Sequence, residues 1–153
     1  MNRYARGVVS GGAATMAMTS AMEAGKRVFP FRTQPPKEVT TNVIDRIGMS
    51  RTIPRPTGPM AWITAHTAFG MVCGMGYMLV RPFLPSSRYA AGLIFGGAVW
   101  GVSYLGYLPA LDLYPSPDDD RRSRTTVMII AHAVFGIVLA EVEHRLSQRD
   151  GHS

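Results

Sequence analysis

The sequence predicts an all-α fold: a polytopic membrane protein with four transmembrane helices arranged as two parallel helical-hairpin repeats. Three observations predict it. Charged residues make up 17% of the 153 residues, below the roughly 25% usual for soluble domains. Four long stretches of the chain carry no charge, and the second and fourth of them share one local sequence. We expect residues 1–153 to form a single transmembrane domain.

The charge-free stretches are long enough to cross a bilayer. About 20 apolar residues span the hydrocarbon core of a membrane. The stretches 58–80 and 89–111 exceed this length, and 7–22 and 125–140 approach it, with snorkelling charged side chains completing the crossing. We therefore predict helices near 6–25, 60–81, 89–109 and 122–145.

A soluble four-helix bundle is the alternative fold. Helices of soluble bundles show a polar face in every two turns, but Gly92–Gly101 contains no polar residue. Glycine at this density would cost a soluble helix about 1 kcal/mol per residue, whereas membrane helices tolerate it. The membrane interpretation is therefore favoured.

The first stretch also has features of a signal peptide, because Arg3 and Arg6 precede an apolar segment that ends in small residues. Its core is only weakly hydrophobic, since Ser10, Thr15 and Thr19 interrupt it. It also has a counterpart later in the chain. We therefore expect it to be retained as the first helix.

That counterpart belongs to an internal repeat. Ala65–Val72 and Ala131–Val138 are identical at five of eight positions, and Gly7–Ala13 more weakly matches Gly92–Ala98. The first and third stretches therefore pair, as do the second and fourth, which indicates a duplicated helical hairpin. A unit with two crossings returns to its starting side, so the two copies would be parallel, related by an axis along the membrane normal.

Glycines at a spacing of four residues lie on one face of a helix and let two backbones approach closely. This spacing predicts packing within the bundle or between subunits. The predicted packing glycines are Gly7 and Gly11, Gly70 and Gly74, Gly92 and Gly96, Gly97 and Gly101, and Gly136, which is followed by Ala140.

The first connection, 26–59, is basic and punctuated by proline. The apolar spacing within 36–48 predicts a short amphipathic helix, lying on the membrane surface or packed over the end of the bundle. The two long connections contain ten Lys and Arg residues, against six at the termini and middle turn. By this small margin the positive-inside rule places the long connections in the cytoplasm.

The start of the last helix has its own signals. Ser116 is suited to the N-cap and Pro117 to the first helical position, with Asp118 and Asp119 in the first turn. Asp120 and Arg124 would then form an i, i+4 pair.

His66 and His132 occupy the same place in the repeat, so they should lie at equal depth in the membrane, with Glu23 near the same side. Intramembrane ionisable residues are functional candidates. Three interpretations stay open. The histidines hold the bundle together by hydrogen bonds, they form a proton or cation pathway with Glu23, or they ligate a b-type haem axially. No dedicated haem motif is present.

The sequence predicts no enzyme. Gly-x-Ser-x-Gly, His-Glu-x-x-His and Walker motifs are absent, and no metal site or required cofactor is expected. Cys73 lies among apolar residues without a cation to activate it, so we expect an inert packing role. The net charge of +6 does not indicate nucleic acid, because the basic residues flank membrane segments.

The overall arrangement resembles the YagU-like family of small bacterial inner-membrane proteins. The resemblance rests on a glycine-rich first helix, a long first connection, an Ala- and Gly-rich third helix, the proline-containing stretch Leu108–Leu113, and a last helix with His132 and Glu141. It is strongest over 91–141. The resemblance implies a multi-pass protein of the bacterial inner membrane and little about biochemistry.

These observations predict an integral membrane protein with a structural or stress-related role. The alternatives are a small transporter or proton- or cation-conducting protein, and a haem-binding membrane anchor or electron-transfer subunit. The expected partners are the lipid bilayer and a second copy of the chain or another membrane subunit.

Overall fold

The computed structural model describes residues 1–29, 34–48, 59–116 and 120–150, and every regular element among them is helical. The predicted all-α class is confirmed for this part of the chain. The elements are α1 (Arg3–Val28), α2 (Pro35–Arg46), α3 (Pro59–Val80), the short helix η2 (Arg81–Phe83), α4 (Arg88–Trp100), η3 (Gly101–Tyr107), α5 (Leu108–Ala110) and α6 (Arg122–Asp150).

Local signals set several helix starts. The Asn2 side chain caps α1 by accepting a hydrogen bond from the Ala5 backbone N–H at 2.8 Å. Ser87 caps α4 in the same way, through Ala90. α2 begins with Pro35, which suits a first helical turn because proline lacks the N–H that would be unpaired there.

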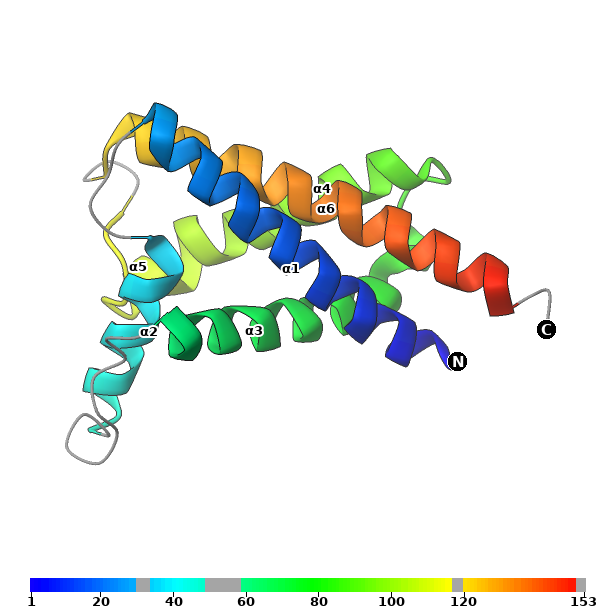
Figure 1. Cartoon of the computed structure of the whole chain (residues 1–153), viewed down its shortest axis with the longest axis horizontal. Coiled ribbons are helices and arrows are strands. Elements are labelled where there is room, and N and C mark those ends of the chain that lie inside the picture. Colours follow the sequence, from blue (N-terminus) through cyan, green and yellow to red (C-terminus); the bar gives the residue numbers. More distant parts are fainter. Residues whose placement is uncertain (30–33, 49–58, 117–119, 151–153) are drawn as a thin grey trace.

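The four long helices form a bundle in which α1 and α6 each pack against two other long helices (Figure 1). α1 packs against α3 and α6, and α4 packs against α6. α3 and α6 run in one direction, while α1 and α4 run in the other, so both chain ends lie at the same end of the bundle. α3 and α4 barely approach each other, although the rings of Tyr77 and Phe95 meet with centroids 5.2 Å apart.

Three helical segments are long and apolar enough to cross a membrane: Met60–Phe83, Arg88–Ala110 and Arg122–Asp150. Many of their large apolar side chains point outward, including Val72 on α3 and Ile94 on α4, which are 58% and 51% exposed. Outward apolar side chains on long helices suit contact with lipid rather than water. α1 is as long as the others but less apolar, and it is not among the three.

The third predicted span, 89–109, is not a regular α-helix throughout. From Gly101 to Tyr107 the α4 helix continues as a π-helix, and Gly106 has non-helical dihedral angles (φ −109°, ψ −106°). A π-helical turn inserts extra backbone and changes which side chains face inward. Here Ser103 and Tyr104 are buried within this segment.

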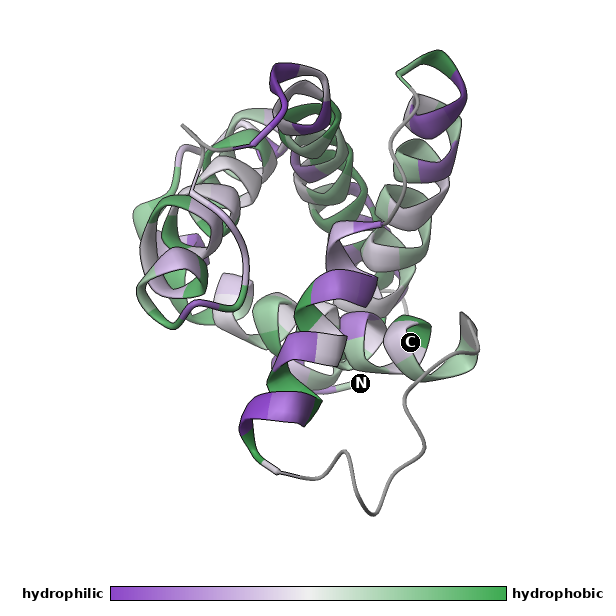
Figure 2. Cartoon of the chain, turned by 90° about the vertical axis from the view of Figure 1, so that its left-hand side faces the viewer, coloured by the Kyte–Doolittle hydropathy of each residue, from purple (hydrophilic) through white to green (hydrophobic). Residues whose placement is uncertain are grey.

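α2 lies over the end of the bundle opposite the chain termini. Its Asn42 side chain donates to the Leu113 carbonyl at 2.8 Å, and Arg46 donates to the Leu111 carbonyl at 2.6 Å. Viewed from this end, Figure 2 shows strongly hydrophilic residues on α2 and a mixture of hydrophobic, near-neutral and hydrophilic residues on the helices behind it. Of the two positions predicted for the amphipathic helix, the structure has the one packed against the bundle.

α6 begins at Arg122, where the predicted span 122–145 begins, and continues to Asp150. The predicted N-terminal residues 117–119 lie outside the described part of the chain. The Asp120–Arg124 pair is confirmed, with 2.6 Å between Oδ1 and Nε.

Candidate functional site

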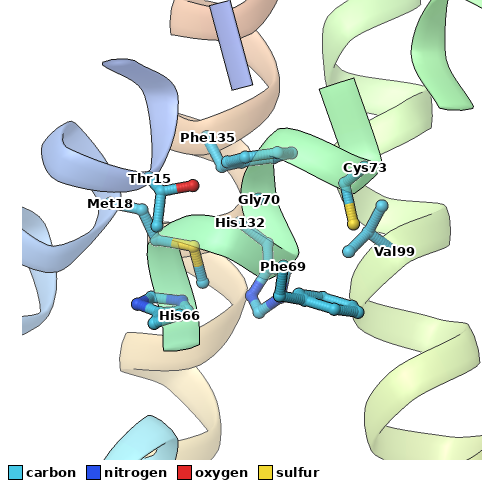
Figure 3. Close-up of a pocket in the computed structure, with 9 residues that line it drawn as sticks. All are labelled: Thr15, Met18, His66, Phe69, Gly70, Cys73, Val99, His132 and Phe135. Atoms are coloured by element: carbon cyan, nitrogen blue, oxygen red, sulfur yellow. The ribbon is translucent and has the colours of Figure 1, made fainter. Parts of the chain in front are cut away.

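His66 on α3 and His132 on α6 line the same cavity inside the bundle (Figure 3). All four long helices contribute to it, because Thr15 and Met18 come from α1 and Val99 comes from α4. The other lining residues are Phe69, Gly70, Cys73 and Phe135. α3 and α6 run in the same direction (Figure 1), and the two matching sequences place both histidines at one cavity.

A hydrogen bond defines the proton position on His132. Its Nδ1 atom lies 2.8 Å from the Met128 carbonyl oxygen, which only accepts, so Nδ1 carries a hydrogen and Nε2 is unprotonated in the neutral form. The Nδ1 atom of His66 lies 3.4 Å from the Thr19 hydroxyl oxygen, and either atom can be the donor of this contact. The Thr19 hydroxyl also contacts the Thr15 carbonyl at 2.9 Å.

The cavity is small and mostly apolar. Phe69, Val99 and Phe135 form its walls, and the space left is about the size of a water molecule or a single ion. Met18 extends its thioether toward the two imidazoles, whereas Cys73 lies at the other end, beside Val99 (Figure 3).

Glu23 does not reach this cavity. Its carboxylate is exposed and accepts a hydrogen bond from Nε2 of Gln34 at 2.8 Å. Glu23 lies one helical turn beyond Thr19 on α1, so Thr19 stands between the carboxylate and His66 along the helix. The structure therefore places His66 and His132 at one cavity, whereas Glu23 lies at the end of the bundle.

Most of the predicted packing glycines lie at helix contacts. On the α1–α3 contact, a Cβ added to Gly7 would lie 2.5 Å from the Gly74 carbonyl oxygen, and one on Gly11 would meet the Gly70 carbonyl. On the α4–α6 contact, a Cβ on Gly92 would meet the Gly136 carbonyl. A Cβ on Gly96 would meet the His132 carbonyl in the same way. Backbone contacts this close leave no room for a side chain.

Gly97 and Gly101 differ from the others. An added Cβ would have no neighbour within 4 Å in the described part of the chain. Both have the spacing of a packing pair, yet they lie on the side of the α4–η3 helix that faces away from α6. Packing of this pair within the bundle, one of the two uses predicted for it, is therefore not seen.

A second polar cluster was not predicted as a unit. The Asp120 side chain is 1% exposed and accepts from the Tyr104 hydroxyl at 2.5 Å, from Arg124 Nε at 2.6 Å and from the Arg121 backbone N–H at 2.8 Å. The Arg124 guanidinium also lies 4.9 Å from the Tyr114 ring centre. The sequence signalled only the Asp120–Arg124 spacing, since the tyrosines come from η3 and the following turn.

The surroundings of the Tyr114 hydroxyl in this cluster disfavour its ionised, negatively charged form. Burial raises the pKa of the Tyr114 hydroxyl, and the nearby carboxylates of Asp120 and Glu38 raise it further, against an opposing effect of Arg124. Glu38 reaches Arg124 from α2 at 3.2 Å. The cluster therefore connects α2, η3 and α6.

Within the described residues, no group of three or more His, Cys, Asp and Glu side chains is arranged to hold a metal ion. The cavity has two histidines and one cysteine, and its remaining lining residues include no carboxylate.

Comparison with known proteins gives one match. The model of a family of unknown function (DUF6789) matches residues 1–153. No curated protein and no solved structure matches the chain. The resemblance to YagU-like proteins stays a prediction, because this match does not connect the two families.

Proposed function

Since the chain belongs to the DUF6789 family, whose function is unknown, we propose from the geometry that it is a four-crossing integral membrane protein with a structural or stress-related role. The observation that carries the proposal is the glycine packing. Both α1–α3 and α4–α6 meet at backbone distance, which is how membrane helices associate where lipid offers no hydrophobic driving force. The resemblance to YagU-like proteins supports the bacterial inner membrane as the location.

The position of α1 supports a fourth crossing. Its 26 residues extend about 39 Å, enough for the hydrocarbon core. Its charged residues lie only near its two ends, at Arg3 and Arg6 and from Glu23 onward. A helix packed against two neighbours exposes less surface to lipid, so small and weakly polar residues such as Ser10 and Thr15, both buried here, are tolerated.

Labelling of single cysteines tests this topology in a Cys73→Ser background. Asn2→Cys and Ser86→Cys should react from one side of the membrane, and Thr41→Cys and Ser116→Cys from the other, tested with an impermeant maleimide on sealed and opened vesicles. If α1 does not cross, Asn2→Cys reacts together with Thr41→Cys, and the four-crossing proposal fails.

The helix contacts partly support the hairpin repeat. Gly7 of α1 faces Gly74 of α3, and its counterpart Gly92 in α4 faces Gly136 of α6. By sequence, Gly136 corresponds to Gly70, so the second contact is offset by one turn. The α1–α6 contact is also close, whereas its symmetry counterpart α3–α4 is open. We propose a duplicated hairpin whose halves diverged after duplication.

A proton or cation pathway is the second candidate. Its support is the cavity shared by His66 and His132, with Thr19 leading from it toward Glu23 at the bundle end. Proteoliposomes loaded with a pH-sensitive dye for protons, or with a metal-sensitive dye for cations, should then show a flux that is at least tenfold lower in His66→Ala and His132→Ala. His144→Ala, at the terminal end, is the matched control. Equal flux in all four proteins would remove this candidate.

Haem ligation, the third interpretation, has less support. Pockets for ligands of drug size occupy about 300–1,000 Å³, far more than the space of water or ion size between the two imidazoles. A Soret band in the purified protein that disappears in His66→Ala would establish haem binding in spite of this.

A further inference from the structure

We propose that the cavity between the histidines is a binding site for a soft monovalent metal ion, Cu(I), with His66, His132 and Met18 as ligands. The inference goes beyond the structural role and names the ion for the second candidate. In Figure 3 the thioether of Met18 and the two imidazoles gather at one end of the cavity. The third donor of this group is a thioether, so the group differs from metal sites made of His, Cys, Asp and Glu alone.

The donor set selects the class of metal. Thioether sulfur is a soft ligand that favours Cu(I), and imidazole binds copper well, whereas Mg²⁺ and Ca²⁺ require oxygen ligands. No carboxylate is among the residues that line the cavity. All three proposed ligands are neutral, so they do not offset a second positive charge. Desolvation costs a divalent ion more than a monovalent one, which disfavours Zn²⁺ here.

The histidines are oriented as metal ligands are. A metal-binding imidazole usually donates its other N–H to a backbone carbonyl or another polar group, which fixes the ring and its tautomer. His132 does this through Met128, and His66 can do it more weakly through Thr19. Among the described residues neither Nε2 atom has a hydrogen-bond partner. The Nε2 atom of His132 therefore keeps a lone pair for a ligand, and that of His66 does so in the tautomer that donates from Nδ1 to Thr19.

The surroundings suit a reduced, dehydrated ion. Phe69, Val99 and Phe135 line the cavity with apolar surface, and its free space is about that of one ion. The cavity is partly open, and Phe69 is 44% exposed. An apolar shell limits the access of water and controls the redox behaviour of the metal. Cys73 lies at the far end of the cavity (Figure 3), so it is not assigned as a ligand.

Anaerobic titration tests the site. The full chain in detergent is titrated with Cu(I) in competition with a chromogenic Cu(I) chelator, and separately with Zn²⁺. We expect one tightly bound Cu(I) per chain and weaker Zn²⁺ binding. Met18→Leu keeps the volume and loses the sulfur, so Cu(I) affinity should fall at least tenfold. Met22→Leu, also buried on α1, and Cys73→Ser should bind as the wild type does.

X-ray absorption gives a second measurement that does not depend on affinity. The copper spectrum should contain a sulfur neighbour in the wild type and in Cys73→Ser, and none in Met18→Leu. The double variant His66→Gln, His132→Gln should bind no stoichiometric Cu(I). Size-exclusion chromatography and circular dichroism of each variant separate loss of ligands from loss of fold.

Three results would overturn the inference: Cu(I) binding no tighter than in the double histidine variant, unchanged binding in Met18→Leu, or tighter binding of Zn²⁺ than of Cu(I). None of them affects the topology experiment, so a four-crossing chain without a copper site remains distinguishable. If copper binds but no flux is measured, the inference of a copper site stands and only the pathway candidate fails.

Discussion

Asp120 carries its charge where almost no water reaches it. Its carboxylate is compensated by Arg124 and by the Tyr104 hydroxyl, both within 2.6 Å. Spacing in the sequence predicted the arginine, because the two residues lie four apart on one chain segment. It could not predict the tyrosine, since a π-helical segment sixteen residues earlier turns Tyr104 toward the aspartate.

Removal of this charge should destabilise the protein. Among the described residues, Asp120→Asn leaves the partly buried Arg124 with Glu38 as its remaining ionic partner, and loss of one member of a buried ion pair costs about 3–5 kcal/mol. Asp112→Asn is the control, because the Asp112 side chain is 88% exposed and its ion pair should contribute about 0–1 kcal/mol. Reversible unfolding in mixed micelles measures both, and equal effects would contradict the role assigned to Asp120.

Tyr114 should make the protein sensitive to alkaline pH. Its pKa is raised in the folded protein, mainly by burial, so above about pH 10 the unfolded chain loses this proton while the folded chain keeps it. The free energy of unfolding should therefore be undiminished below pH 10 and then fall by up to about 1.4 kcal/mol per pH unit.

The variant Tyr114→Phe lacks this proton and should show a shallower decline above pH 10. Tyr4→Phe, a tyrosine 44% exposed near the N-terminus, serves as control. If the free energy of unfolding fell equally with pH in the wild type and in Tyr114→Phe, ionisation of this hydroxyl would not cause the loss of stability.

At the scale of helices, sequence spacing predicted which glycines form pairs but not which pairs meet a neighbour. Gly92 and Gly96 have the same separation as Gly97 and Gly101, and both pairs lie on one continuous helix. Only the first pair faces α6. The pairs differ by their angle around the helix axis, so the direction in which α6 packs decides which pair is buried.

Alanine substitutions should separate the two kinds of glycine. At Gly11 and Gly92 the new methyl group would meet a backbone carbonyl that cannot move alone, so each variant should lose about 1–3 kcal/mol or more. At Gly97 and Gly101 the same change should be neutral or stabilise the helix by up to about 1 kcal/mol. Thermal unfolding in detergent measures the difference. Destabilisation by Gly97→Ala would instead indicate a contact with another chain.

The outer surface of the whole bundle indicates which solvent surrounds it. Large apolar side chains point outward along three helices, while ion pairs such as Arg6–Asp150 and Arg124–Glu38 lie at opposite ends. An apolar middle between two polar ends matches the layers of a bilayer.

An arginine in the middle of α3 tests this directly. Val72 is 58% exposed. In lipid, Val72→Arg should cost about 2.5–3.5 kcal/mol and reduce membrane insertion, whereas on a water-exposed surface it would change stability by less than about 0.5 kcal/mol. Phe83→Arg is the control, because this 87% exposed residue lies at the helix end. The amount of protein retained in carbonate-washed membranes measures insertion. Unchanged insertion of Val72→Arg would contradict a lipid-facing α3.

The sequence by itself determined the helical class, the approximate bounds of the long helices and the equivalence of His66 and His132. These properties depend on local composition and periodicity, which require no knowledge of how helices pack. Tertiary structure decided what lies beside each histidine: Met18 and Thr19 come from α1, which is distant in sequence and brought near by its contact with α3. It also decided that α1 and α6 each pack against two long helices, because the rotation and crossing of each helix depend on every neighbour at once.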